Sequence, residues 1–265
     1  MGNLTERQRH ILKYARERGE VQVELLAEQL EVTPQTIRRD LNFMCDIRLL
    51  QRVHGGAVVH DGVSNLGYEA RRRFMAEEKT AIGQVAAELI PDDSSLFINI
   101  GTTTEEAARQ LTQHRGLLVV TNNINVVHIL RQNPSARFMI AGGSVRSEDG
   151  GIVGESTAEF IDQFKLDHAI IGVSAIESDG TLLDYDQQEV RVAKAIIKNA
   201  RVTILVADSV KFERSAPMRI GNISEVDLLV TDKEPPASFR QYCLKNRVDI
   251  LVANRAQESR EAHGA

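Results

Sequence analysis

The sequence is poor in cysteine and contains no long apolar run. Cys45 and Cys243 are the two cysteines among 265 residues, and they lie far apart in sequence. This usage predicts a reducing, cytoplasmic environment and excludes a disulfide framework. No apolar stretch approaches the roughly 20 residues that cross a bilayer. The polar N-terminus predicts no secretory signal, so we expect no association with a membrane.

Metal-ligand spacing and a strong positive charge are also missing. The seven histidines are scattered along the chain, so we expect neither a metal site nor a cofactor. The net charge of −5 alone argues against a nucleic-acid partner. Residues 1–60, however, hold nine Lys and Arg against eight Asp and Glu (+1), and the remainder holds 23 against 29 (−6). Any contact with DNA must therefore depend on where the charges are placed.

The segment TPQTIRRDLN, residues 33–42, predicts a helix with an unusual outward face. Thr33 can cap this helix, and Pro34 suits its first position. The helical period buries one face, made of Ile37, Leu41 and Met44. The opposite face has amide and guanidinium groups and no carboxylate, namely Gln35, Arg38, Arg39 and Asn42. Arginine pairs with guanine and Gln or Asn with adenine, so this face is typical of a recognition helix. The two arginines alone would favour a merely solvated face, and the surrounding segments reverse that preference.

The preceding residues supply the rest of a helix-turn-helix. Thr5 and Gln8 predict a capping box, and Gly19 ends the first helix. A second helix is expected from about Glu24 to Leu30, followed by a turn over residues 31–33. The apolar residues expected in these two helices' buried faces are Ile11, Leu12, Ala15, Leu25, Leu26 and Leu30.

The segment LLQRVHGGAV, residues 49–58, predicts a two-stranded hairpin, the wing of a winged helix. Arg52 and His54 near its tip can reach phosphate or the minor groove, although a plain stabilising hairpin is the alternative. The DNA contacts predicted from both segments are Thr33, Gln35, Thr36, Arg38, Arg39, Asn42, Arg52 and His54.

TIRRDL followed by LLQRVHGGAV resembles the DNA-binding domain of the DeoR family of bacterial transcriptional regulators. The two motifs occur in the family's order and spacing. Arg48 departs from the family, which generally has Gly or Asn before the Leu-Leu pair. A left-handed residue is expected there, so this departure predicts strain or a shift at the entry to the wing.

The C-terminal part has short apolar strands that alternate with helices, which predicts an α/β fold with a parallel sheet covered on both faces. A long helix is expected first, from the charged residues 69–79 through Leu89. Strands are expected at residues 96–100, 117–121, 138–141, 169–173, 202–207, 228–231 and 249–252. Helices are expected at residues 105–111, 124–131, 189–199 and 237–246.

Small or polar residues follow most of these strands, and ligands bind at the carboxyl edge of such sheets. Gly101 allows close approach of a ligand, and the helix that begins there favours an anion such as phosphate. Arginine and lysine can add charge, and Asn or Asp can bind hydroxyl groups. The predicted effector contacts are Gly101, Thr102, Thr103, Thr104, Asn122, Asn123, Gly142, Gly143, Arg146, Asp184 and Lys211.

The resemblance to the DeoR family also covers this part, through NIGTTT, VTNN, AGGSVRSEDGGIVGE, SAIESDGTLLDYDQQEVRVAKAII and DSVKF. It implies a sensor domain similar in fold to ribose-5-phosphate isomerase and sugar-phosphate deaminases. It implies a repressor of a carbohydrate or glycerol catabolic operon, a dimer or tetramer bound to double-stranded operator DNA. The implied effector is a small phosphorylated metabolite, a sugar phosphate or, as first choice, glycerol 3-phosphate. Asn99 stands where relatives often have Asp.

These expectations give a winged helix-turn-helix domain over residues 1–60, a linker over 61–76, a sensor domain over 77–253 and a frayed tail over 254–265. Two other classes stay open. A sugar-phosphate isomerase or deaminase could use Asp179, Asp184, Glu189 and Lys194 for proton transfer, although fold does not give function. A protein-binding adaptor is disfavoured, because the sequence predicts no exposed aromatic cluster.

Overall fold

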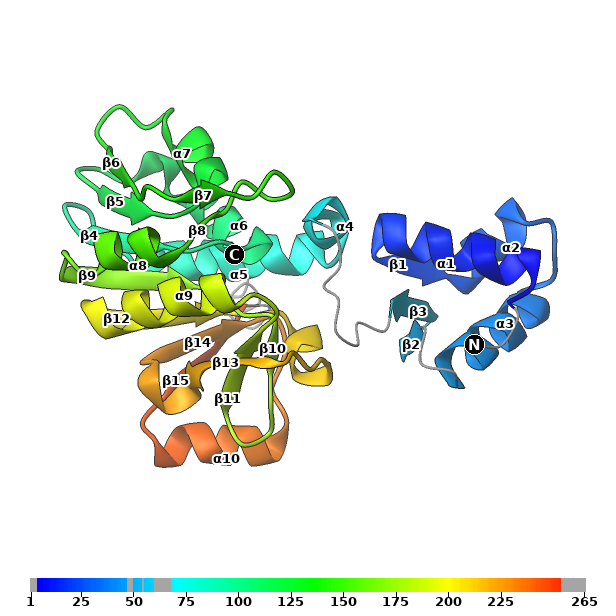
Figure 1. The fold of residues 1–265 in the computed structure, drawn as a ribbon. Helices are drawn as coiled ribbons and strands as arrows, with labels where there is room; N and C mark the ends of the chain where they lie inside the picture. The colour runs from blue at the N-terminus through cyan, green and yellow to red at the C-terminus, as the bar shows by residue number, and fades with distance from the viewer. Residues whose placement is uncertain (1–3, 47–49, 54, 60–67, 254–265) are drawn as a thin grey trace, which may run out of the picture. The chain divides into compact units, whose positions relative to one another are not determined.

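The computed structural model describes residues 4–46, 50–53, 55–59 and 68–253. The chain divides into two units, residues 1–76 and 77–265 (Figure 1). The domain borders expected at residues 60, 76 and 253 stay predictions, and the expected tail lies outside the described residues. In the described ranges, no helix combines the length and the apolar character needed to span a bilayer.

The first unit contains the predicted helix-turn-helix. Helix α1 (Glu6–Arg18) begins with the expected capping box, in which the Thr5 hydroxyl accepts from the Gln8 N–H and Gln8 accepts from the Thr5 N–H. It ends at Gly19, as predicted. Helices α2 (Val23–Gln29) and α3 (Pro34–Asp46) follow. The predicted helix order is therefore confirmed.

A three-stranded sheet completes this unit. Strands β2 (Leu50–Val53) and β3 (Gly56–Val59) form the predicted hairpin. Strand β1 (Glu20–Gln22), which lies between α1 and α2, pairs with β3 and was not expected. A Cβ atom on Gly56 would lie 2.0 Å from the Val21 carbonyl oxygen. Glycine is therefore required where β1 approaches the wing.

The buried faces of these helices are mostly as predicted. Ile37, Leu41 and Met44 are fully buried against the apolar residues of α1. Leu25 was expected inside, but 49% of its surface is exposed. In α2 the inward positions are Val23, Leu26 and Ala27, spaced i, i+3 and i+4, and Leu25 falls outside this face. The expectation for Leu25 was therefore wrong.

The expected single long helix is two helices. Helix α4 (Tyr68–Arg73) packs against α1, and helix α5 (Ala76–Glu88) begins three residues after α4 ends. Between them Met75 has a φ of 55°, in the left-handed region, where a right-handed helix cannot continue. The buried Phe74 side chain lies at the same break.

The second unit is built on a seven-stranded sheet in which all neighbouring strands are parallel, in the order β15-β14-β12-β9-β4-β5-β6 (Figure 1). This confirms the predicted fold class. In chain order the strands are β4 (Ser95–Ile98), β5 (Leu118–Thr121), β6 (Arg137–Ile140), β9 (Leu166–Ile171), β12 (Ala200–Val206), β14 (Leu228–Thr231) and β15 (Asp249–Val252).

Helices cover both faces of this sheet. Along β4, the side chains of Leu96 and Ile98 pack into one core, and that of Phe97 packs into the other. The first core includes α5, α6 (Thr102–Gln110) and α7 (Ile124–Leu130). The second includes α8 (Glu155–Ile161), α9 (Gln187–Asn199) and α10 (Ala237–Lys245). Cys243 of α10 is fully buried, burial raises the pKa of its thiol to about 11, and it forms no disulfide with Cys45.

Two small antiparallel sheets accompany the large one. Strands β7 (Ser144–Val145) and β8 (Ile152–Val153) form a hairpin, and β10 (Ala175–Ile176), β11 (Thr181–Asp184) and β13 (Met218–Asn222) form a separate three-stranded sheet. Short 3₁₀ helices occur at η1 (Leu111–Gln113), η2 (Ser209–Glu213) and η3 (Ile223–Glu225). The small sheets were not predicted, because most of their strands are too short to show a period.

Candidate DNA-binding face and effector site

The outward face of α3 is arranged as the sequence predicts. Gln35, Arg38, Arg39 and Asn42 are all exposed, whereas Thr36 is half-buried. The Thr33 hydroxyl accepts from the Thr36 N–H at 3.3 Å and shares a hydrogen bond of 2.9 Å with the Thr36 hydroxyl. Thr33 and Thr36 therefore secure the start of the helix, and the amide and guanidinium groups stay in solvent.

The carboxylate within this segment points inward. Asp40 is 6% exposed and accepts from Arg7 Nε at 2.6 Å and from the buried amide of Gln8 at 3.0 Å. It thereby joins α3 to α1 and adds no carboxylate to the exposed face. The charge on that face is consequently positive, although residues 1–60 together are nearly neutral.

The two arginines of α3 differ in their surroundings. Arg38 donates from Nη2 to Glu24 of α2 at 3.1 Å, with the two side chains 47% and 65% exposed. An exposed pair of this kind is worth about 0–1 kcal/mol, so Arg38 can exchange it for DNA at little cost. Arg39 has no hydrogen bond or ion pair in the described ranges.

One of the two predicted wing contacts, Arg52, lies among the described residues. Arg52 is exposed on β2, opposite Ala57 of β3. His54, the other predicted wing contact, and Arg48, the departure from the family pattern, both lie outside the described residues.

In the second unit, helix α6 begins at the carboxyl end of β4, without a side-chain cap at Gly101. The first backbone bond of the helix runs from the Glu105 N–H to the Gly101 carbonyl. In the described chain the N–H groups of residues 102–104 therefore have no acceptor. The Thr104 hydroxyl donates to the carbonyls of Asn99 and Gly101, at 2.9 and 2.8 Å. The turn is held by its own threonine, and its amide groups can bind an anion.

Asn122, directly after the neighbouring strand β5, is 1% exposed. Its amide nitrogen donates to the Ile152 carbonyl at 2.9 Å, but its Oδ1 atom has no partner in the described part of the chain. A buried acceptor without a donor costs free energy that a ligand hydroxyl can recover. Asn123, in contrast, caps α7 through the Asn125 N–H, and donates to Glu105.

Gly142 and Gly143 follow β6. The Gly142 carbonyl accepts from the Thr157 hydroxyl at 2.9 Å. A Cβ atom on Gly143 would lie 2.2 Å from that hydroxyl oxygen. Close packing against α8 therefore explains the glycine at position 143, whereas a Cβ atom on Gly142 would meet no atom within 4 Å. The role of both residues as effector contacts stays a prediction.

The end of β12 adds an acceptor that was not among the predicted contacts. Asp208 is 2% exposed, and its Oδ1 atom has no hydrogen-bond partner among the described residues. Lys211 lies in η2, three positions later, and its N–H donates to the Asp208 carbonyl. Asp232, which follows β14, accepts from the N–H and the hydroxyl of Ser209. The sequence identifies Asp208 only as a polar residue after a predicted strand, because it cannot show that Oδ1 lacks a partner among the described residues.

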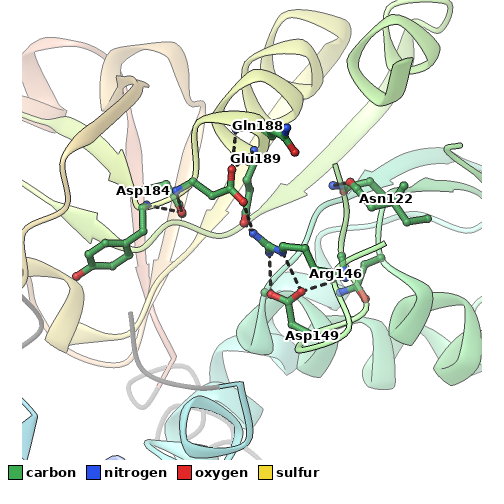
Figure 2. Close-up of polar contacts among 12 residues, drawn as sticks. Asn122, Arg146, Asp149, Asp184, Gln188 and Glu189 are labelled. Carbon is green, nitrogen blue, oxygen red and sulfur yellow. Dashed lines mark hydrogen bonds and ion pairs between the residues drawn. The ribbon is translucent and has the colours of Figure 1, made fainter. Parts of the chain in front are cut away.

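The surroundings of Arg146, in the loop between β7 and β8, were not predicted. Its guanidinium bonds Asp149 at 3.1 and 2.7 Å, Asp186 at 2.8 Å and Glu189 at 2.8 Å. Figure 2 shows Arg146 between Asp149 of its own loop and Glu189 of α9. Burial alone would lower the pKa of Arg146, but the charges of Glu189 and Asp149 outweigh this effect and raise the pKa.

We call these four residues, Arg146, Asp149, Asp186 and Glu189, the Arg146 clasp. The clasp joins the β7–β8 loop to the start of α9, where Asp186 is the N-cap. All three guanidinium nitrogens are used by carboxylates. An effector phosphate would have to displace them, so a structural role accounts for Arg146 without a ligand. The predicted contact between Arg146 and an effector stays untested.

Asp184 is likewise occupied by protein groups. It is 6% exposed and accepts from the Ser174 hydroxyl at 2.9 Å and from the Tyr185 N–H at 2.6 Å. Asp179, another carboxylate considered for proton transfer, precedes β11, whereas Asp184 ends it, so the length of this strand separates them. Asn99 donates to the Gly172 carbonyl and accepts from the Gly172 N–H, which ties β4 to β9.

A winged helix-turn-helix with an exposed Gln, Arg and Asn face, joined to an α/β unit with polar groups at the carboxyl edge of its sheet, is typical of a transcription regulator with a sensor domain. Residues 7–63 match the DeoR-like helix-turn-helix domain, and residues 75–233 match the DeoR C terminal sensor domain. The chain belongs to the DeoR family of transcriptional regulators.

Several curated relatives match almost the whole chain. A glycerol-3-phosphate regulon repressor of Haemophilus influenzae is 46% identical, covering 94% of this chain and 96% of its own length. The Escherichia coli protein of the same name is 44% identical, covering 93% and 98%. The likeness that TPQTIRRDLN, VTNNINV and GGIVGE suggest to these repressors is thus confirmed. The HTH-type transcriptional repressor CsqR of Escherichia coli is 41% identical over 94% of this chain and 96% of its own length.

The fold also resembles a solved structure of ribose-5-phosphate isomerase in complex with phospho-erythronic acid, with a TM-score of 0.39 and 17% sequence identity. The match covers 52% of this chain and 54% of the isomerase chain. At this level the likeness gives no information about chemistry. The three relatives named above, at 41–46% identity, are repressors. The chain is therefore a regulator, and the isomerase or deaminase alternative is not supported.

Proposed function

We propose that this protein is a transcriptional repressor that glycerol 3-phosphate releases from its operator. The observation that carries the proposal is the exposed polar face of α3, in a chain 46% identical to a glycerol-3-phosphate regulon repressor. Helix α3 enters the major groove, where Gln35, Arg38 and Asn42 read base edges. Arg39 binds backbone phosphate, as do Arg52 and His54 of the wing.

The proposed effector site lies at the carboxyl edge of the large sheet. The N–H groups of residues 102–104 bind the phosphate, where the partial positive charge of the helix start favours an anion. The partnerless oxygens of Asn122 and Asp208 accept hydrogen bonds from the hydroxyl groups. Lys211, three positions after Asp208, adds positive charge to the site. Backbone donors and buried acceptors together fit a small phosphorylated polyol.

A proline substitution tests the phosphate contact at the start of α6. Thr102→Pro removes one N–H group at the first helical position, where proline is tolerated. We expect glycerol 3-phosphate to bind at least about 10-fold more weakly, because a hydrogen bond to a charged group is worth roughly 1.5–3 kcal/mol. Calorimetry measures this, with Thr102→Ala as the matched control that keeps the N–H. Equal affinities for the two variants would remove this amide from the site.

Substitution of Lys211 separates effector binding from DNA binding. Lys211→Ala is expected to bind operator as the unsubstituted protein does, but to need much more glycerol 3-phosphate for release. A typical coupling of about 1–3 kcal/mol between effector binding and DNA binding weakens operator binding 5- to 150-fold. An effector that binds poorly no longer weakens operator binding at the same concentration. Fluorescence anisotropy on labelled operator measures the response. Lys245→Ala, on the exposed end of α10, is the control and should respond normally.

The proposed function itself is tested by a gel shift with the DNA upstream of the protein's own gene. We expect a complex that resists random competitor DNA and dissociates when glycerol 3-phosphate is added. A complex that random DNA removes as easily as the specific fragment does would contradict sequence-specific binding. A specific complex that glycerol 3-phosphate leaves intact would contradict the effector alone.

A further inference from the structure

Strand β6 forms an open edge of the seven-stranded sheet. Within the described chain it pairs on one side, with β5. The N–H groups of Arg137 and Ala141 donate to the carbonyls of Leu117 and Thr121, at 2.8 and 2.9 Å. Because alternate residues of a parallel strand bond the same neighbour, the backbone groups of Phe138 and Ile140 point away from β5. The edge therefore presents two N–H and two carbonyl groups that no described strand uses.

The side chains at this edge are apolar and exposed. Met139 is 40% exposed and Ile140 is 44% exposed. Ile124 at the start of α7 and Val145 of β7 are 39% and 54% exposed, and they follow β5 and β6 closely in sequence. Arg137 is the single charged residue within 137–143. Edge strands of monomeric proteins are usually protected by charges, and an apolar open edge is typical of an interaction surface.

We infer that β6 is a self-association surface, on which the β6 strand of a second copy pairs antiparallel across a two-fold axis. A register centred on Met139 places Phe138 of each copy opposite Ile140 of the other. These are the residues whose backbone groups point outward, so the pairing satisfies all of them on both strands. The same register places each Arg137 opposite Ala141, at opposite ends of the paired strands. No like charges then face each other.

A second copy would also supply the phosphate contacts that a single DNA-binding unit lacks. Residues 1–60 have a net charge of +1, so one unit provides few net counterion-releasing contacts. Two joined copies bind two half-sites, and the second binding event becomes intramolecular. This reason rests on the proposed function, whereas the geometry of β6 does not.

The test places a charge on the proposed axis. In Met139→Lys, two ammonium groups would face each other across the closely spaced pair at the centre of the register. We expect sedimentation equilibrium of the full chain to give half the mass of the unsubstituted protein, and the same for Met139→Glu. An equimolar mixture of the two variants should recover the full mass, because the opposed charges then attract. Met218→Lys is the matched control, since Met218 of β13 is 37% exposed, and it should keep the full mass.

The inference is overturned if the unsubstituted protein is a monomer, or if Met139→Lys keeps the full mass. It is also overturned if the mixture stays at half mass, or if Met218→Lys dissociates equally. Recovery in the mixture excludes misfolding as the cause of dissociation. Binding of the unsubstituted protein to operator, measured in parallel, tests the proposed function separately. Failure to bind operator would contradict the proposed function and would leave the mass from sedimentation equilibrium unaffected.

Discussion

Arg38→Ala is expected to cost about 1–3 kcal/mol of discrimination between operator and random DNA at each half-site. Arg38 is exposed near the start of α3, and a two-pronged bond to guanine is the contact that its guanidinium makes best. The loss of its exposed pair with Glu24 is worth about 0–1 kcal/mol, so the stability of the protein should hardly change. Competition titrations with specific and random fragments at fixed salt measure the discrimination.

Arg39→Ala provides the comparison. If Arg39 binds phosphate, its loss should weaken specific and random DNA about equally and reduce the dependence on salt. Arg9→Ala is the control, because Arg9 is an exposed arginine of α1 whose Nε donates to the Leu4 carbonyl. An Arg38→Ala protein with undiminished preference for operator would show that α3 is wrongly placed as the reading helix.

Arg146→Ala is expected to lower the free energy of unfolding by about 3 kcal/mol, the lower end of the range for breaking a buried ion pair. The lower end applies because the Arg146 side chain is 24% exposed. Without the guanidinium, three carboxylates of the clasp remain close together, and that of Asp149 is 5% exposed. Denaturant unfolding measures the loss. Arg146→Lys should recover part of it, since one ammonium cannot bond all three carboxylates.

Arg191→Ala is the matched control for the clasp, because Arg191 is an exposed arginine of the same helix as Glu189. Its loss should change the free energy of unfolding by less than about 0.5 kcal/mol. Calorimetry of folded Arg146→Ala with glycerol 3-phosphate then decides whether Arg146 also binds the effector. Normal stability of Arg146→Ala together with lost effector binding would identify Arg146 as a phosphate ligand and refute the clasp.

The parts of this protein that the sequence predicts well are those whose signal is local. The parallel strands are continuous apolar runs, and each was predicted within a few residues of its observed bounds. The buried and exposed faces of α3 follow from the helical period alone. The capping box at Thr5 and Gln8 depends on residues three positions apart.

The parts that the sequence does not predict depend on partners far along the chain. In the Arg146 clasp, Asp186 and Glu189 lie about 40 positions from Arg146. A short stretch of sequence around Arg146 therefore does not show how many carboxylates surround it. The oxygens Asn122 Oδ1 and Asp208 Oδ1 have no hydrogen-bond partner in the described part of the chain, which only the folded arrangement of distant residues reveals. Strand β1 has three residues, too few to show a period, and it forms by pairing antiparallel with β3. The left-handed Met75 divides a segment whose composition favours one helix.

The most direct test of a repressor with a phosphate-binding sensor is calorimetry of the full chain with glycerol 3-phosphate, fructose 1-phosphate and unphosphorylated glycerol. The N–H groups at the start of α6 bind phosphate in this account, so glycerol 3-phosphate should bind and glycerol should not. Glycerol 3-phosphate should also bind more tightly than fructose 1-phosphate. Binding of glycerol with the same affinity as its phosphate would contradict the account.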